Sequence, residues 1–91
     1  MLNTKFTPAP ANPASIATSV DQHVGRRIRG KRRALGLSEE NLATVLGVEA
    51  NQIAAYERAV ERVPSDQLIR LGQVFGVPLS YFFPATPFAA L

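Results

Sequence analysis

The chain has 91 residues, with ten basic against seven acidic side chains, no Cys and a single His. This length allows one small domain, and no apolar run reaches the roughly 18 residues that a membrane span needs. Without Cys there are no disulfides or thiolate metal sites, and one His without acids at ligand spacing does not form a zinc site.

The first 19 residues are predicted to be a flexible arm. They contain Pro8, Pro10 and Pro13 among small polar side chains and show no sustained periodicity. Each proline fixes φ and removes a backbone donor. We expect this arm to become ordered only on a partner, because too little of it can be buried to offset the lost entropy. The folded domain is predicted over residues 20–83.

The first predicted helix begins at Asp21, which can serve as its cap, and is stopped by Gly36. Its apolar stripe contains Val24, Ile28, the aliphatic stem of Arg32, and Leu35. Gly30 lies inside this helix, where glycine is less favourable than alanine by up to about 1 kcal/mol. The spacing of the apolar side chains nevertheless favours one continuous helix.

Positive charge is concentrated in this first helix. Six basic side chains lie between His23 and Arg33 with no acid among them, whereas residues 34–91 carry three bases and six acids. Such a cluster predicts an anionic partner, for example a phosphate backbone. The alternative is a basic helix face that contacts only solvent.

The second predicted helix begins after the N-cap Ser38 and ends at Gly47, after barely two turns. Its apolar face contains Leu42, Ala43, Val45 and Leu46. The third predicted helix covers residues 50–58 and buries Ile53 and Tyr56. The short connection between these two helices has the turn length of a helix-turn-helix.

A fourth helix is predicted to follow Pro64 and to end at Gly76, and a short fifth helix begins at Pro78. The apolar side chains at helical spacing are Leu68, Leu71 and Phe75 in the fourth, and Leu79, Phe82 and Phe83 in the fifth. Residues 84–91 are predicted to form an apolar tail. Since no segment has the alternation of a strand, the predicted fold class is all-α with five helices.

Several sequence motifs occur together in a recognisable order. They are His23-Val24-Gly25-Arg26-Arg27-Ile28-Arg29, Leu35-Gly36-Leu37-Ser38, Leu42-Ala43, Leu46-Gly47-Val48, Ile53, Tyr56-Glu57-Arg58 and Val77-Pro78-Leu79-Ser80-Tyr81-Phe82-Phe83. Together they resemble the helix-turn-helix family of phage repressors and Cro, the XRE family, over about residues 20–83. The resemblance implies a five-helix, lambda-repressor-like bundle and a homodimer on a two-fold-symmetric operator. It also implies that the third helix enters the DNA major groove while the second crosses the backbone.

The resemblance assigns expected roles to individual residues. Arg32 and Glu57 match a partly buried ion pair that joins the first helix to the third. The positions that contact bases correspond to Ala50, Asn51, Gln52, Ala54 and Ala55, of which the two amides can hydrogen-bond to adenine. Contacts to the DNA backbone are expected from Arg26, Arg29, Lys31, Arg58 and Arg62.

Three positions depart from the family pattern. Glu39 replaces the usual Gln at the start of the second helix, and Glu49 replaces a Ser or Thr before the third. With Glu61, they place carboxylates on the surface expected to face DNA. Ala59 replaces a Gly, so we expect the turn after the third helix to be made differently, by lengthening that helix.

The sequence therefore predicts a cytoplasmic, DNA-binding transcriptional regulator that dimerises through its last helix and apolar tail. Its partner is double-stranded DNA, and neither a membrane nor a small-molecule cofactor is expected. The departures at Glu39 and Glu49 leave an alternative, a protein-interaction module of the same fold that has lost DNA binding. An enzyme is not expected, because the sequence contains no paired carboxylates, activated nucleophile or glycine-rich phosphate loop.

Overall fold

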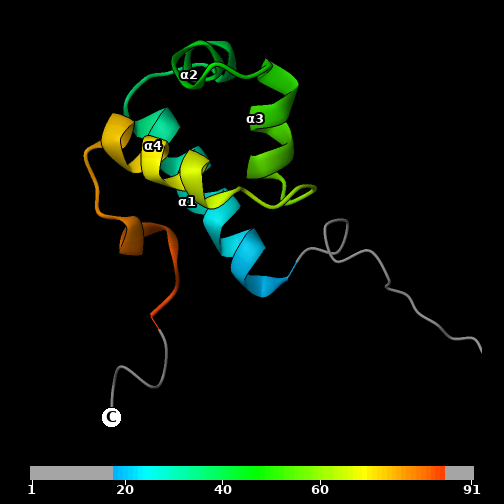
Figure 1. Ribbon diagram of the computed structural model, residues 1–91, viewed down its shortest axis with the longest axis vertical. Helices are drawn as coiled ribbons and strands as arrows, with labels where there is room; N and C mark the ends of the chain where they lie inside the picture. The colour runs from blue at the N-terminus through cyan, green and yellow to red at the C-terminus, as the bar shows by residue number, and fades with distance from the viewer. Residues whose placement is uncertain (1–17, 86–91) are drawn as a thin grey trace, which may run out of the picture.

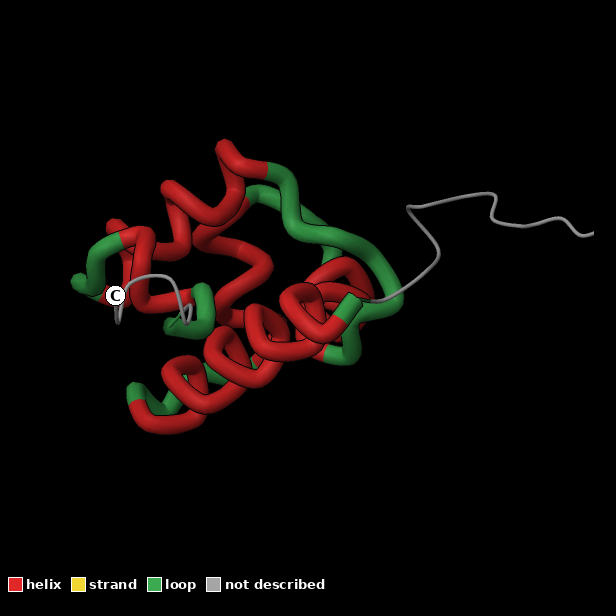
Figure 2. The backbone as a smooth tube through the Cα atoms, turned by 90° about the horizontal axis from the view of Figure 1, so that it is seen from below, coloured by secondary structure: helices red, strands yellow, loops and turns green. Residues whose placement is uncertain are grey.

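The computed structural model describes residues 18–85, which contain helices and loops but no strand (Figures 1 and 2). The helices are α1 (Ser19–Ala34), α2 (Glu39–Leu46), α3 (Ala50–Glu57), α4 (Ser65–Phe75) and the 3-10 helix η4 (Leu79–Phe82). The predicted all-α class is confirmed for these residues. The predicted fifth helix is only a 3-10 turn, so the described part of the chain has four α-helices. The arm up to residue 17 and the tail from residue 86 lie outside the described residues.

Helix α1 begins earlier than predicted, and Asp21 is not its cap. Thr18 is the N-cap, and its hydroxyl accepts a hydrogen bond from the Asp21 backbone amide at 3.0 Å. The Asp21 carboxylate in turn accepts from the Thr18 amide at 3.2 Å, which completes a capping box. Thr18 and Ser19 therefore belong to the domain and not to the predicted arm. Helix α2 has the same arrangement, with Ser38 as the predicted cap and Asn41 as its partner.

Each α-helix is followed, within two residues, by a residue with left-handed backbone conformation. Three of these residues are glycines, namely Gly36, Gly47 and Gly76. After α3 the position is held by Ala59, at φ 59°, and the Val60 amide donates to the Ala55 carbonyl across the turn at 2.9 Å. This is the Schellman arrangement, in which glycine is usual because a Cβ is unfavourable there. The predicted lengthening of the third helix is therefore wrong, because α3 stops at Glu57 and Ala59 makes the turn itself.

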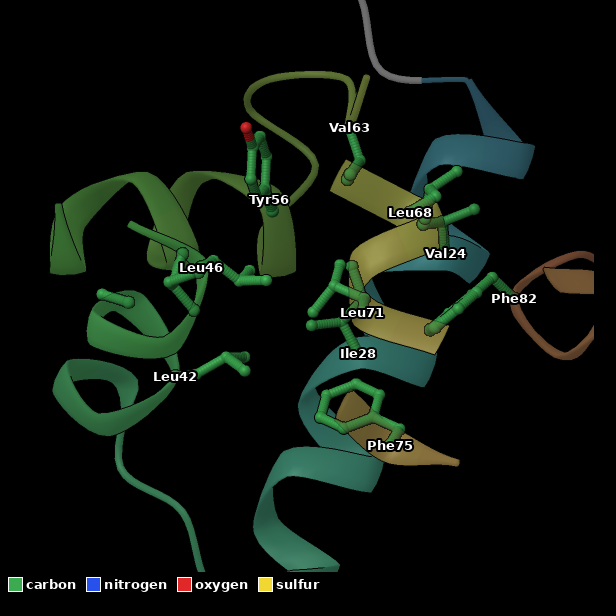
Figure 3. Packing of buried hydrophobic residues seen from close by; sticks show 12 residues of the cluster. Val24, Ile28, Leu42, Leu46, Tyr56, Val63, Leu68, Leu71, Phe75 and Phe82 are labelled. Carbon is green, nitrogen blue, oxygen red and sulfur yellow. The ribbon is translucent and has the colours of Figure 1, made fainter. Parts of the chain in front are cut away.

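The core lies between the α2–α3 pair and the α1–α4 pair (Figure 3). Its fully buried large side chains are Ile28, Leu42, Leu46, Ile53, Leu71 and Phe82. Phe82 from η4 packs beside Phe75 of α4, with ring centroids 6.2 Å apart. Each helix is too short to be stable alone, so burial of this shared core holds the helix-turn-helix in place.

Some predicted core residues are exposed. Leu35 is 49% exposed because α1 has already ended at Ala34, and the turn carries the next side chain away from the core. Val45 is 51% exposed, since the buried side of α2 is the narrow stripe of Leu42, Ala43 and Leu46. In η4 only Phe82 is fully buried. None of the helices between residues 18 and 85 combines the length and apolarity that crossing a membrane requires.

Asp21 also links α1 to the loop before α4, and this link should make stability depend on pH. Arg62 donates to the Asp21 carboxylate through Nε at 3.2 Å. Burial raises the pKa of Asp21, but hydrogen bonds from Thr18 and Arg62 outweigh it, so the pKa lies below its usual value. The folded state therefore favours the carboxylate, and this stabilisation is present above about pH 4 and is lost as the pH falls through the lowered pKa.

We therefore expect Asp21→Asn to reduce the free energy of unfolding at pH 7 by about 0.5 kcal/mol, as exposed pairs and caps do. In urea titrations, the difference from the parent protein should shrink progressively below about pH 4. A difference that stayed constant down to pH 2 would contradict this role of the carboxylate charge.

Candidate nucleic-acid interface

Helices α2 and α3 form a helix-turn-helix whose second helix is exposed along one side. Gly47 ends α2, and α3 starts at Ala50 after two intervening residues. Ile53 and Tyr56 attach α3 to the core, while the opposite side presents a stripe of Asn51, Ala54, Ala55 and Arg58. These positions repeat every three or four residues, so they share one face of the helix. Ala50 packs against the core cluster and is not part of this outer face.

A buried ion pair connects this exposed helix to α1. Arg32 Nε and Nη2 donate to the two carboxylate oxygens of Glu57 at 2.6 and 3.1 Å, and Arg32 Nη1 donates to the Leu37 carbonyl at 2.8 Å. The side chains of Arg32 and Glu57 are only 11% and 3% exposed. The hydrogen bond to Glu57 raises the pKa of Arg32 despite burial, so the guanidinium stays charged. One side chain thus holds α1, the α1–α2 loop and the end of α3 together.

Around this pair lies a polar depression, which we call the arginine hollow. It is lined by Arg29, Arg32, Arg33, Ser38, Glu39, Glu57 and Arg58. It lies where the end of α1, the start of α2 and the end of α3 meet. Because Glu57 is matched by Arg32, the remaining side chains are three arginines against Glu39, and the hollow is positively charged. Within residues 18–85, none of these three arginines forms an ion pair.

One residue that lines the hollow was not among the predicted DNA backbone contacts, and several of the predicted contacts do not line it. Arg33 lines it, and its spacing of four from Arg29 could have revealed their shared helix face. Lys31 lies on another side of α1, with its ammonium 5.9 Å from the Tyr81 ring centroid. Arg27 stacks on the same ring at 4.8 Å. The basic cluster of α1 is thus divided between two faces.

The other predicted backbone contacts also lie outside the hollow. Arg62 is bound to Asp21 near the start of α1, about 18 Å along the helix from Arg33 at 1.5 Å per residue. Arg26 is exposed on α1 but does not line the hollow. The structure therefore brings together Arg29 and Arg58 from the predicted set in the hollow, whereas Arg26, Lys31 and Arg62 do not line it.

The carboxylates that depart from the family pattern have separate surroundings. Glu39 lies among the arginines of the hollow. Glu49 precedes α3 as its N-cap residue but makes no capping hydrogen bond with its side chain. Glu61 accepts a hydrogen bond from the Gln52 amide nitrogen. One of the two predicted base-contacting amides is therefore already engaged within the protein.

The fold and this exposed second helix define a helix-turn-helix domain, and the comparisons agree. Residues 28–82 match the family model described as Helix-turn-helix. The chain therefore belongs to the helix-turn-helix family, of the type that the sequence motifs resemble. A solved structure with this fold is the restriction-modification controller protein C.AhdI from Aeromonas hydrophila, with a TM-score of 0.67 and 26% identity. The match covers 72% of this chain and 100% of that chain.

Two curated relatives are described as transcriptional regulators. An uncharacterised regulator in the ATPase CF(0) region of Rhodospirillum rubrum is 44% identical over 74 residues, which are 81% of this chain and 68% of that protein. An uncharacterised HTH-type transcriptional regulator of Sinorhizobium medicae is 43% identical over 68 residues, covering 75% of this chain. The match spans only 49% of the length of the Sinorhizobium protein. The relatives to which this chain is similar are thus described as transcriptional regulators.

Proposed function

We propose that the protein binds double-stranded DNA, with α3 in the major groove and the arginine hollow on the phosphate backbone. The hollow is the observation that carries this proposal. Within residues 18–85, Arg29, Arg33 and Arg58 form no ion pair, and they line the hollow together with the start of α2, where the helix dipole also favours an anion. The exposed stripe of α3 ends at Arg58, so a phosphate in the hollow would lie next to the bases that this stripe contacts.

Glu39 weakens this phosphate site without reversing its charge. Glu39 lines the hollow together with Arg29, Arg33 and Arg58, and these three positive charges outnumber its single negative charge. An anionic backbone would therefore still meet a positive surface. This charge balance favours DNA binding over the alternative of a protein-interaction module.

We also propose that the protein binds DNA as a homodimer. The α4–η4 side of the domain has exposed apolar side chains, including Ile69 and Leu79, around a shallow apolar hollow that also includes Leu68 and Val77. Two copies that bury this side would present their α3 helices to successive turns of the duplex. Sedimentation equilibrium of the free protein and of its DNA complex tests this stoichiometry.

The experiment that tests DNA binding is selection from a random duplex pool at low salt, followed by titration of the enriched duplex across ionic strength. We expect a palindrome whose half-sites lie about one helical turn apart, with affinity falling steeply as salt rises. No enrichment, with salt-independent or absent binding, would contradict the proposal and favour the interaction module.

Arg58→Ala should weaken binding to every duplex alike, because its guanidinium is assigned to phosphate and not to a base. Titration of the enriched duplex should give a salt slope smaller by about one. Arg70→Ala is the matched control, since Arg70 is an exposed arginine of α4 outside the hollow. The role of Arg58 would be refuted if both variants had the slope of the parent protein.

A further inference from the structure

We propose, resting on the DNA binding proposed above, that α3 recognises an adenine followed by base pairs that present thymine methyl groups. Asn51 supplies the base hydrogen bonds, and the methyl groups of Ala54 and Ala55 contact the thymines. Gln52 is hydrogen-bonded to Glu61 and does not contact bases. The operator half-site is therefore A·T-rich where α3 lies in the groove.

The composition of the exposed stripe carries the first part of the inference. Asn51 is exposed at the start of α3, the partly exposed Ala54 and Ala55 follow one turn later, and the exposed Arg58 closes the stripe in the arginine hollow. Asparagine can hydrogen-bond to N6 and N7 of adenine in a bidentate manner, and alanine can contact only the thymine methyl group. Since α3 has eight residues, it is about 12 Å long and spans three to four base pairs.

The two alanines also distinguish A·T from G·C pairs through the thymine methyl group. Both kinds of pair carry hydrogen-bonding groups in the major groove for which alanine offers no partner, so these groups do not separate them. Burying a thymine methyl group against alanine is favourable, and an unmodified G·C pair has no such group. The small side chains further allow the helix backbone to lie close to the base edges. The same face thus favours A·T pairs.

The second part of the inference comes from the turn after α3. The Ala55 carbonyl accepts from the amides of Val60 at 2.9 Å and Glu61 at 3.3 Å, so the chain folds back beside the helix. This brings the Glu61 carboxylate to the Gln52 side chain, whose amide nitrogen donates to it. That hydrogen bond uses one of the two N–H groups of the Gln52 amide and holds the side chain beside the turn. Gln52 also lies next to Asn51 in the sequence, so its side chain leaves the helix in a different direction and does not belong to the exposed stripe.

The DNA side of the test uses the duplex enriched by selection, with single thymines replaced by uracil, which lacks only the methyl group. At each thymine contacted by an alanine we expect a loss of about fourfold in affinity, the equivalent of one buried methyl group. Replacing that thymine's A·T pair by G·C removes the same methyl group and should cost at least as much, and 5-methylcytosine in that G·C pair should recover the part of the loss that is due to the methyl group. If replacing thymine by uracil changed the affinity at none of the positions, the inference would be wrong.

The protein side compares Asn51→Ala with Gln52→Ala. Asn51→Ala should bind the enriched duplex about 10-fold more weakly and should no longer distinguish the adenine from other bases. Gln52→Ala should change affinity less than threefold in the parent protein. In a Glu61→Ala background, which frees the amide, Gln52→Ala should have a larger effect on base preference. Circular dichroism checks folding, which none of these substitutions at exposed or partly exposed positions should disturb.

The outcomes separate this inference from the proposed function. If no duplex is enriched, DNA binding itself fails. If a G·C-rich half-site is enriched, or if Gln52→Ala is as costly as Asn51→Ala, DNA binding stands and the assignment of α3 is wrong. An A·T-rich half-site that is sensitive to uracil and to Asn51→Ala supports both.

Discussion

Replacing Glu57 by Ala should lower the free energy of unfolding by about 3 to 5 kcal/mol, measured by urea denaturation at neutral pH. The substitution leaves the Arg32 guanidinium buried without the carboxylate that it contacts at 2.6 Å. Burying an unpaired charge is among the most costly changes a small domain can undergo. A domain whose total stability is about 5 to 15 kcal/mol would be left marginal.

Two further variants separate the cost of the unpaired charge from other effects. Arg32→Met combined with Glu57→Leu should recover most of the loss, because apolar side chains can replace a buried pair without leaving a charge. Arg62→Ala, which breaks the exposed pair with Asp21, should cost less than about 1 kcal/mol. If Glu57→Ala cost no more than Arg62→Ala, the buried pair would not be holding α1 to α3.

Gly25→Ala should destabilise the domain by about 3 kcal/mol, at the upper end of what overpacking usually costs. A Cβ at Gly25 would lie 2.5 Å from the Glu57 carbonyl oxygen and 2.7 Å from that of Tyr56. Both are backbone atoms at the end of α3, so α3 itself would have to move away from α1. We therefore expect weaker DNA binding as well as a lower melting temperature, since the shift displaces α3 from the arginine hollow.

Gly30 on the same helix provides the control. An added Cβ there meets no atom within 4 Å, and Gly30 is exposed in the middle of α1. Gly30→Ala should therefore stabilise the domain by up to about 1 kcal/mol through helix propensity alone. If Gly25→Ala and Gly30→Ala changed the stability equally, close packing of α1 on α3 would not account for the cost at Gly25.

The helices were predictable because their boundaries are set by local interactions. The capping box at Ser38 and the turns at Gly36, Gly47 and Gly76 involve residues a few positions apart, so their pattern is visible in the sequence. Where the sequence offers two possible caps, as at Thr18 and Asp21, only the hydrogen bonds distinguish the cap from its partner three residues later.

The turn at Ala59 was not predictable from propensity. Alanine avoids left-handed backbone conformation, so the sequence favoured a longer helix. In the structure Ala59 is buried and the chain reverses there, which brings Val63 into the core. The tertiary packing outweighs the local cost, and the same turn places Glu61 beside Gln52.

The sequence alone determined an all-α helix-turn-helix domain with a strongly basic first helix, because helix periodicity, caps and charge are properties of neighbouring residues. Only the tertiary structure decided which of these charges lie together on one surface. Arg29 and Arg33 meet Arg58 across 25 or more residues of chain, whereas Arg27 and Lys31, although their neighbours in sequence, stack on Tyr81. The physical reason is that the rotation of α1 about its own axis is set by its buried side, and that rotation sends adjacent basic side chains to different faces of the domain.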